Sequence, residues 1–454
     1  MRIALLRAFR PATSLWMLML LALALRVVVV ALTSGAGYDI MSYAIQAQSV
    51  LTHHNIYAFT DRYPYPPVWV WLVALAQWVA NSTGLSFDGL VRFPGMVGDV
   101  GIVALLYRRK GNLAALFYAA NPVAILITAG HGQFDGLVMA LVVAAWALWE
   151  NERRHMAWAA LALGGAIALK GYPVLLLPGL LIGAESHQRR ALLIGLAFTP
   201  LLVSMLVYSA FFGLEPAMIT HVLGYQSPAI FGWGLYLNKP FPQLALLLGG
   251  PARVAVLLFP VLLALRKPHW PLASHWLATF LGFYVLAPGL SPQYLLWVLP
   301  LLAAVDLNKG LLYTAFATLA LMVAYLKNFP SAVPGGPELA AAIPADVLYV
   351  GQRVVNLIWL LACLWLLWSM FLRTPHKTWR AEQPLLAAPP RLSANRLAAR
   401  DGGAASGDAD LAVFKETAPD RRESSDSSRP ESANQPETDE NRAESQPDSN
   451  SHIP

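Results

Sequence analysis

The sequence GYDIMSYAIQAQSVLTHHNIYAFTDRYPYPP, residues 37–67, is the polar and aromatic stretch around which the rest of the chain is arranged. It contains two acids, two adjacent histidines, five tyrosines and three prolines, and it closely follows the first long apolar segment, Leu15–Leu32. An apolar segment of that length can span a bilayer. We therefore expect residues 37–67 to lie just outside the membrane, as one half of an active site at its surface.

The composition indicates a membrane protein. Of the 454 residues, 57% are hydrophobic and only 13% are charged, whereas soluble domains carry about a quarter charged residues. Apolar segments of near-membrane length recur along the chain and are continuous rather than alternating, which favours helices over a β-barrel. We expect an all-α polytopic membrane protein. The single cysteine, Cys363, excludes an intramolecular disulfide and argues against a cysteine-based metal site.

The distribution of charge predicts the orientation. The net charge is +6, but residues 401–454 contain 13 acidic and 5 basic residues, so the remainder is strongly basic. We interpret this excess as the positive-inside signal and not as nucleic-acid binding. The clusters expected in the cytoplasm are Arg2/Arg7/Arg10, Arg108–Lys110, Arg153–Arg154, Arg189–Arg190 and Arg266–Lys267. Residues 37–67 would then be extracytoplasmic and both termini cytoplasmic.

The same reasoning divides the chain into elements. Residues 1–373 are expected to form a transmembrane bundle of about 10–13 helices, with juxtamembrane helices in the first outer loop near residues 40–51 and 68–80. Lys170 is expected at the apex of two half-helices, because the segment between two basic clusters is too short for two full spans. Spans are also expected at 15–32, 87–107, 113–129, 136–149, 191–212, 272–286, 295–305, 311–326 and 347–372, and a further span is expected to end at Arg266. Residues 374–454 lack the apolar side chains of a core, which predicts a disordered cytoplasmic tail.

Four motifs in order along the chain resemble the GT-C superfamily of integral-membrane glycosyltransferases. They are the early acid Asp39 with the late Tyr65-Pro66-Pro67, then Asn121-Pro122 with His131-Gly132-Gln133-Phe134-Asp135, then Ala168-Leu169-Lys170-Gly171-Tyr172-Pro173, and finally Ser291-Pro292-Gln293-Tyr294-Leu295-Leu296-Trp297. The resemblance covers roughly residues 10–372 and is greatest to the mannosyl- and glucosyltransferases that use polyprenyl-phosphate sugars.

The resemblance implies an activity. A hexose, by preference mannose, would move from a polyprenyl-phosphate-linked donor to an acceptor hydroxyl, with inversion, on the outer side of the cell inner membrane. The acceptor would be a glycan, a glycolipid or a protein, and membrane lipid would surround the enzyme. Asp39 matches the acid that acts as general base, which is suitable chemistry for a hydroxyl nucleophile. No nucleotide-binding motif is present, and no cofactor is expected. No metal is expected either, because Asp135 stands alone and the first outer loop has no Asp-x-Asp pair.

The resemblance also implies roles for other residues. Lys170 would hold the carrier phosphate, since a lysine in apolar surroundings requires an anion. The other residues expected to bind the donor or its phosphate are Tyr172, Arg26, Gln293 and Tyr294, with Arg92 as a further cation. Those expected to bind substrate are His131, Gln133, Asp135, Tyr63, Tyr65 and His221.

Structural alternatives remain open for each of these residues. Asp39 would cap a helix N-terminus, Arg26 and Lys170 would reach toward the interface, and Asp61 would pair with Arg62 or be exposed to solvent. The Tyr63–Pro67 cluster would shape its loop, and the motifs at 131–135 and 293–294 would cap and pack helices. A transporter or flippase of lipid-linked sugars is the alternative function, although we detect no inverted repeat. A glycan polymerase or ligase is another, although the outer loops contain few arginines.

Overall fold

The computed structural model describes residues 14–151, 155–225 and 227–372. These residues lie within one compact unit. Three groups of expectations lie outside them: the N-terminal arginines, the Arg153–Arg154 cluster and the C-terminal tail. The part of the chain that is described contains helices and an isolated bridge between Phe231 and Leu290. This confirms the all-α expectation.

The helices follow each other with short connections. In chain order they are α2 (Leu15–Leu32), α3 (Gly37–Leu51), α4 (Ile56–Phe59), α5 (Val68–Thr83), α6 (Phe87–Lys110), α7 (Asn112–Ala119), α8 (Pro122–Ile125), η1 (Leu126–His131), α9 (Asp135–Asn151), α10 (Met156–Leu169), η3 (Tyr172–Leu176), α11 (Leu177–Ile182), α12 (His187–Phe212), α13 (Ala217–Gly224), α14 (Gly234–Leu237), α15 (Pro242–Arg266), α16 (Leu272–Leu286), η4 (Pro292–Leu296), α17 (Leu299–Val305), α18 (Leu307–Asn328), η5 (Pro330–Ala332), α19 (Gly336–Ala342) and α20 (Ala345–Leu372).

Several of these helices are long and apolar enough to cross a bilayer. Among the described residues there are six, namely α2, α6, α12, α15, α18 and α20, and a seventh if the pair from Asn112 to His131, bent by 45°, is one span. Shorter apolar helices occupy Met156–Leu169, Tyr172–Ile182, Leu272–Leu286 and Pro292–Val305. The chain is therefore a multi-pass membrane protein. The interruption at Lys170 and the helix at 272–286 agree with the sequence expectation.

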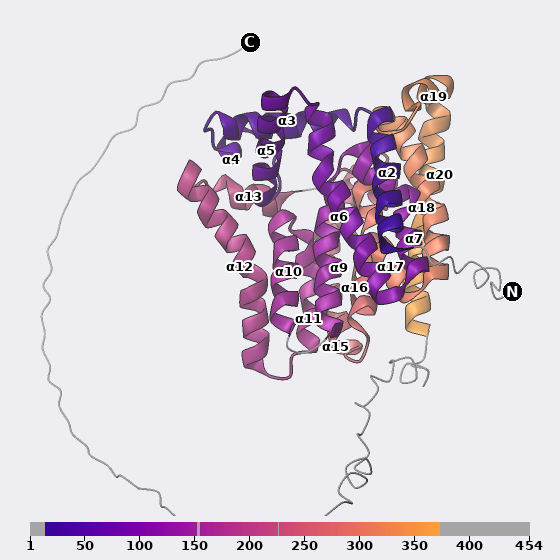
Figure 1. Ribbon diagram of the computed structural model, residues 1–454. Helices are drawn as coiled ribbons and strands as arrows, with labels where there is room; N and C mark the ends of the chain where they lie inside the picture. Colours follow the sequence, from indigo (N-terminus) through magenta and orange to yellow (C-terminus); the bar gives the residue numbers. More distant parts are fainter. Residues whose placement is uncertain (1–13, 152–154, 226, 373–454) are drawn as a thin grey trace, which may run out of the picture. The chain divides into compact units, whose positions relative to one another are not determined.

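The helices of the first outer loop lie across one end of the long helices, where α13 and α19 are also found (Figure 1). In the bundle, α6 packs against α9, and α10 lies between α9 and α12. The contact between α6 and α9 depends on Gly98, where a Cβ atom would lie 2.3 Å from the backbone nitrogen of Leu137. This close approach places the start of α9, which carries Asp135, directly against α6.

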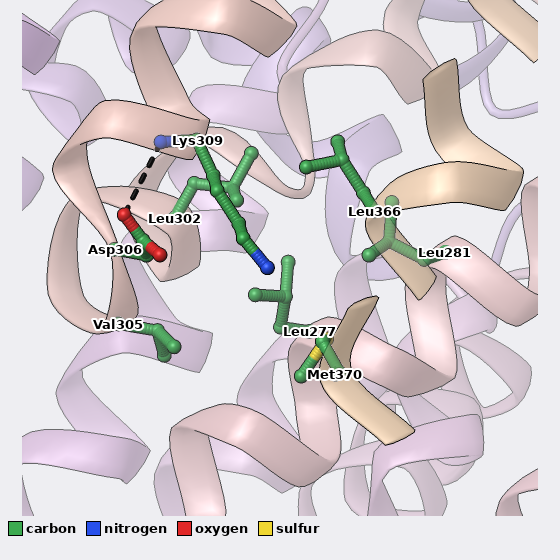
Figure 2. Close-up of a pocket in the computed structure, with 8 residues that line it drawn as sticks. All are labelled: Leu277, Leu281, Leu302, Val305, Asp306, Lys309, Leu366 and Met370. Atoms are coloured by element: carbon green, nitrogen blue, oxygen red, sulfur yellow. Dashed lines mark hydrogen bonds between the residues drawn. The ribbon is translucent and has the colours of Figure 1, made fainter. Parts of the chain in front are cut away.

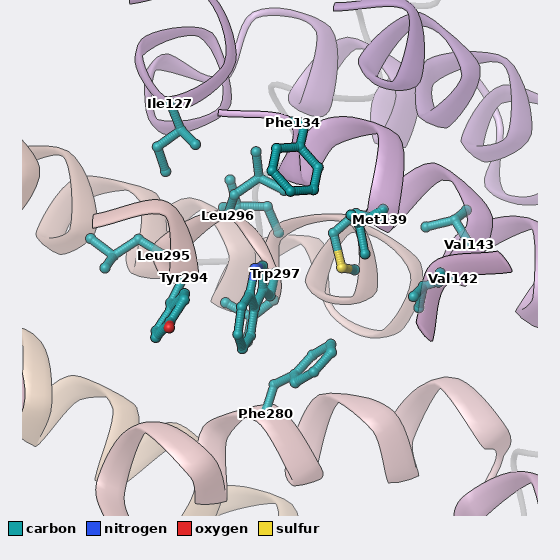
Figure 3. Packing of buried hydrophobic residues seen from close by; sticks show 14 of the residues in the cluster. Ile127, Phe134, Met139, Val142, Val143, Phe280, Tyr294, Leu295, Leu296 and Trp297 are labelled. Atoms are coloured by element: carbon teal, nitrogen blue, oxygen red, sulfur yellow. The ribbon is translucent and has the colours of Figure 1, made fainter. Parts of the chain in front are cut away.

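Aromatic side chains fill the space between α9, α16 and the segment from η4 to α17. Figure 3 shows Trp297 between Phe280 and Tyr294, with Met139 of α9 nearby. Trp297 and Phe280 are fully buried. Large rings contribute much of the buried area in such a core. The packing fixes Trp297, whose indole nitrogen takes part in the polar cluster described next.

Candidate active site

Asp39 lies in the first turn of α3, where the chain turns from the first span into the outer loop. Ala36, and not Asp39, is the N-cap residue of α3, and the cap makes no side-chain hydrogen bond. The backbone N–H of Ala36 donates to the carbonyl of His131, at 2.9 Å. The alternative that Asp39 caps the helix is therefore not what the structure shows, and Asp39 instead joins the His131 segment.

The two oxygens of the Asp39 carboxylate have different surroundings. Oδ2 lies 2.5 Å from Nε2 of His131 and accepts a hydrogen bond from Nε2 of Gln133 at 2.8 Å. Among the described residues no hydrogen bond engages Oδ1, and 26% of the side-chain surface is exposed. Oδ2 is thus held by protein donors, and the carboxylate keeps part of its surface exposed.

His131 closes the short π-helix η1, and Gly132 then takes a left-handed conformation with φ of 94°. Nδ1 of His131 lies 3.0 Å from the hydroxyl of Tyr325, a residue of α18. The His131 ring therefore lies between Tyr325 of α18 and the Asp39 carboxylate. Tyr325 was not a candidate from sequence, because nothing local connects it to residues almost 200 positions earlier.

Lys170 follows the last residue of α10 in an extended conformation. Its Nζ donates to Oδ2 of Asp135 at 2.6 Å and to Oε1 of Gln133 at 3.5 Å. Oδ1 of Asp135 accepts a hydrogen bond from the indole N–H of Trp297 at 2.7 Å. Lys170 and Asp135 are both buried. The anion that we expected Lys170 to require is therefore supplied, at least in part, by Asp135.

These bonds form a continuous polar cluster, which runs in the order Tyr325, His131, Asp39, Gln133, Lys170, Asp135 and Trp297. The ring of Phe134 lies under the Lys170 ammonium at 4.7 Å and that of Tyr65 at 5.1 Å. The Gln133 amide is central, because its N–H reaches Asp39 while its oxygen faces Lys170. The structure thus brings together His131, Gln133, Asp135, Lys170, Tyr65 and Asp39.

The surroundings of Asp39 shift its ionisation. Burial alone would raise the pKa of Asp39, but the hydrogen bond and Coulombic interaction with His131, together with the Gln133 hydrogen bond and the positive charge of Lys170, outweigh that effect. The pKa of Asp39 therefore lies below its ordinary value. The carboxylate is ionised at neutral pH, which is the form that accepts a proton.

Arg26 and Tyr63 do not join this cluster. Arg26 is fully buried and pairs with Asp99 at 2.6 Å, and Asp99 also accepts hydrogen bonds from Tyr118 and Thr128. The buried guanidinium therefore does not reach the interface, and its ion pair is with Asp99 rather than with a member of the cluster. Tyr63 donates to the carbonyl of Pro66 and accepts from the backbone N–H of Val70. Its hydroxyl is occupied in shaping the loop, as the structural alternative expected.

His221 contacts a different part of the outer surface. Its Nε2 lies 3.3 Å from Oδ1 of Asp61, whose side chain is fully exposed. Of the two sequence alternatives for Asp61, solvent exposure is confirmed and pairing with Arg62 is not, because the guanidinium of Arg62 lies over the ring of Tyr38 at 4.7 Å. His221 therefore connects α13 to the first outer loop rather than to Asp39.

Tyr172, Tyr294 and Gln293 lie on the Asp135 side of the cluster. The ring of Tyr172 stacks on Trp297 at 3.4 Å, and that of Tyr294 lies 4.3 Å from it. Gln293, the residue before Tyr294, is buried. These side chains surround the indole that donates to Asp135, so the motif at 291–297 adjoins the motif at 131–135.

Two cavities lie outside the cluster. One of about 530 Å³ opens beside the connection between α2 and α3 and is lined by Ala31, Leu32, Thr33, Ser34, Ser331, Val333, Gly335, Pro337 and Glu338. Arg92 donates to Thr33 in this wall and to the carbonyl of Ala129. Figure 2 shows the other, of about 20 Å³, among Lys309, Leu366 and Met370. It has room for about one water molecule and not for a sugar.

The described residues contain no group of three or more His, Cys, Asp or Glu side chains that could hold a metal ion. Asp39 and Asp135 are each bonded to nitrogen donors instead. The arrangement suits proton transfer and the binding of a polar molecule.

Fold and site together define a multi-pass helical membrane protein with a carboxylate-centred polar cluster where several helices meet. A family model described as Glycosyltransferase family 87 matches residues 63–221, which include His131, Gln133, Asp135 and Lys170. This match confirms the resemblance to glycosyltransferases that the motifs indicated. A similar solved structure is ArnT from Cupriavidus metallidurans bound to undecaprenyl phosphate, with 17% identity, a TM-score of 0.45 and coverage of 76% of each chain. No curated protein matches this chain.

Proposed function

We propose that the protein transfers a hexose from a polyprenyl-phosphate-linked donor to an acceptor hydroxyl, with inversion at the anomeric carbon. The observation that carries the proposal is the Asp39 carboxylate, with one oxygen held by His131 and Gln133 and the other without a hydrogen-bond partner among the described residues. His131 and Gln133 lie within residues 63–221, the part of the chain that the model of Glycosyltransferase family 87 matches, and this supports the proposal. Mannose is the preferred sugar, and this preference derives from the motif resemblance alone.

The chemistry needs one base and one good leaving group. Oδ1 of Asp39 accepts the proton of the acceptor hydroxyl while the hydroxyl oxygen forms a bond to the anomeric carbon. The bond from that carbon to the phosphate oxygen breaks, and its electron pair leaves with the polyprenyl phosphate. A depressed pKa keeps Asp39 ready to accept the proton at neutral pH.

We propose that the departing phosphate lies near Lys170. An ammonium group has three donors, and Lys170 directs two of them to Asp135 and Gln133. Tyr172, Gln293 and Tyr294 adjoin the same region through Trp297. We leave Arg26 out of the proposed donor site, because its charge is paired with Asp99 inside the bundle.

The charge distribution supports an extracytoplasmic site. Helix α6 ends in Arg108, Arg109 and Lys110, whereas Arg92, near its other end, lies beside the connection that leads to Asp39. Likewise α18 starts near Lys309, and Tyr325, close to its other end, reaches His131. Arg108–Lys110 and Lys309 thus lie at helix ends away from the cluster, and the positive-inside rule favours the cytoplasm for those ends, whereas Lys327 lies at the same end of α18 as Tyr325.

The experiment is sugar transfer in membranes that contain wild-type protein or Asp39→Asn, supplied with radiolabelled polyprenyl-phosphate mannose. We expect wild type to form a product and Asp39→Asn to lose about 10²–10⁴-fold in rate, the usual contribution of a general base. Asp61→Asn is the matched control, because Asp61 is an exposed acid in the same loop. Unchanged transfer by Asp39→Asn at equal expression and thermal stability would contradict the base assignment.

The same assay tests the donor and the competing functions. Glucosyl and arabinosyl donors replace the mannosyl donor if wild type forms no product. A transporter or flippase forms no glycosidic bond with any of them, and a polymerase or ligase requires a pyrophosphate-linked glycan. Product from a pyrophosphate-linked donor alone would therefore exclude the proposed reaction.

A further inference from the structure

Three cationic side chains surround one exposed tyrosine ring far from the Asp39 carboxylate in sequence. The Arg353 guanidinium lies 3.9 Å from the ring centre of Tyr349, the Lys327 ammonium 4.8 Å and the Lys239 ammonium 5.8 Å. Arg353 lies near the start of α20, Lys327 at the end of α18, and Lys239 in the connection between α14 and α15. We call these four residues the Tyr349 cluster. Its three positive charges share one small patch of surface.

No acid neutralises this patch. Among the described residues, none of the three cations forms an ion pair. Lys327 donates to the uncharged Gln352 amide at 2.6 Å, and Arg353 donates to the carbonyl of Leu235 at 3.3 Å. Asp346, in the first turn of α20, forms no ion pair with them either. Nη1 of Arg353 is buried and has no hydrogen-bond partner. The ring face offsets only part of the repulsion between like charges, so the patch has capacity for an anion.

The surface that continues from the Tyr349 cluster is apolar. Val350, Val354, Leu357 and Leu361 of α20 are each about half exposed, with exposed fractions of 57%, 52%, 47% and 55%. Their spacing of three to four residues places them along one face of the helix, and α20 is a candidate membrane span. The cations lie near the first turns of this span, where a bilayer has its headgroups. A ligand that fits both features has an anionic head and a hydrocarbon chain.

We propose that Lys239, Lys327 and Arg353 bind the phosphate headgroup of an anionic membrane phospholipid, with its acyl chains along α20. The site is separate from the proposed sugar-transfer cluster, because none of its residues bonds to Asp39, His131, Gln133, Lys170 or Asp135 in the described structure. Each basic side chain near a membrane surface attracts anionic lipid with a free energy of about 1 kcal/mol. The proposal does not depend on the transfer reaction.

The test uses the full chain labelled at one position. Cys363 is the single cysteine and is buried, so Val350→Cys, one helical turn from Arg353, takes a thiol-reactive fluorophore. The labelled protein is reconstituted in phosphatidylcholine bilayers that contain spin-labelled phosphatidylglycerol or spin-labelled phosphatidylcholine. We expect spin-labelled phosphatidylglycerol to quench the fluorophore with an apparent affinity about tenfold higher than that of spin-labelled phosphatidylcholine. In the double variant Lys239→Gln/Lys327→Gln we expect this ratio to fall close to one.

Controls keep the result specific to the Tyr349 cluster. Lys267→Gln removes a lysine that also lies over aromatic rings, those of Trp270 and Phe371, but beyond the last residue of α15. It should leave the ratio at position 350 unchanged. Lys239→Gln alone, at an exposed side chain, should lower the ratio even if the double variant is less stable. Equal quenching by both lipids in wild type, or a ratio that neither variant lowers, would overturn the proposal.

A further arm separates a lipid from a free anion. Excess inorganic phosphate is added and compared with chloride at equal ionic strength. If phosphate abolishes the preference and chloride does not, free phosphate occupies the site and the assignment to lipid is wrong. If both salts weaken the preference to the same modest extent through screening, the lipid assignment stands.

Discussion

Two aspartates of the same outer loop have opposite surroundings. Asp39 is fixed by His131 and Gln133 and keeps a quarter of its side-chain surface exposed. Asp61 is fully exposed, and its Oδ1 lies 3.3 Å from Nε2 of His221. A general base must hold one orientation relative to the reacting hydroxyl. We propose Asp39 as the base because its carboxylate is held in one orientation, whereas that of Asp61 is not.

The pH dependence of transfer should report the hydrogen bond from Gln133. In the proposed reaction ionised Asp39 is the active form. Its depressed pKa means that we expect activity, like the contribution of Asp39 to stability, to be present at higher pH and lost as pH falls through that pKa. Gln133→Leu removes one bond to Oδ2, so we expect the acid limb of kcat/KM to move to higher pH. Gln77→Leu, in an exposed pair with Asn81 on α5, is the control and should not move it. Identical profiles for all three proteins would contradict this role.

Lys170 and Asp135 should depend on each other for stability. Both are buried and lie 2.6 Å apart, so Lys170→Met leaves an unpaired buried carboxylate. We expect a loss of about 3–5 kcal/mol, measured as a lower thermal unfolding midpoint in detergent. Lys170→Met combined with Asp135→Asn should recover part of this loss, because Trp297 can still donate to the asparagine oxygen. A double variant no more stable than the single one would exclude charge pairing as the cause.

At the scale of elements, the fit of α6 against α9 should tolerate no extra methyl group at Gly98. A Cβ there would lie 2.3 Å from the backbone nitrogen of Leu137, so the helices must separate. We expect Gly98→Ala to cost about 1–3 kcal/mol of stability and to lower transfer, since Leu137 is two residues beyond Asp135. Gly101→Ala is the matched control on the same helix, where the nearest atom is 3.8 Å away. Equal unfolding midpoints for the two variants would contradict the close-packing argument.

The elements themselves could largely be predicted from the sequence. The length of the apolar segments and the charge clusters predicted a helix at 272–286, a helix that ends at Arg266 and a break at Lys170. The structure has all three at these positions. The partners of buried charges could not be predicted, because periodicity describes one helix and not its neighbours. Arg26 with Asp99, Asp135 with Trp297 and His131 with Tyr325 join residues 73, 162 and 194 positions apart. Without such pairings, Arg26 and Lys170 both remained candidates for a phosphate.

At the scale of the whole molecule, the proposed orientation can be tested with single cysteines. Asp61→Cys places a thiol on the exposed outer loop, and Arg189→Cys places one at the first turn of α12. Native Cys363 is buried and should stay unlabelled. We expect a membrane-impermeant maleimide to label Asp61→Cys in intact cells and Arg189→Cys only after permeabilisation. The reverse pattern would place the Asp39 carboxylate in the cytoplasm.

The π-helix before His131 has a consequence for how this protein changes over evolution. Hydrogen bonds in a π-turn run from i to i+5, so the turn from Leu126 to His131 holds one more residue than an α-turn. Removal of one residue between Leu126 and Gly130 would restore α-helical winding and rotate His131 by about 100° away from Asp39. Every side chain of the cluster would still be encoded. In this segment, therefore, the position of His131 depends on the number of residues as well as on their identities. Deletion of one codon would be enough to lose the site.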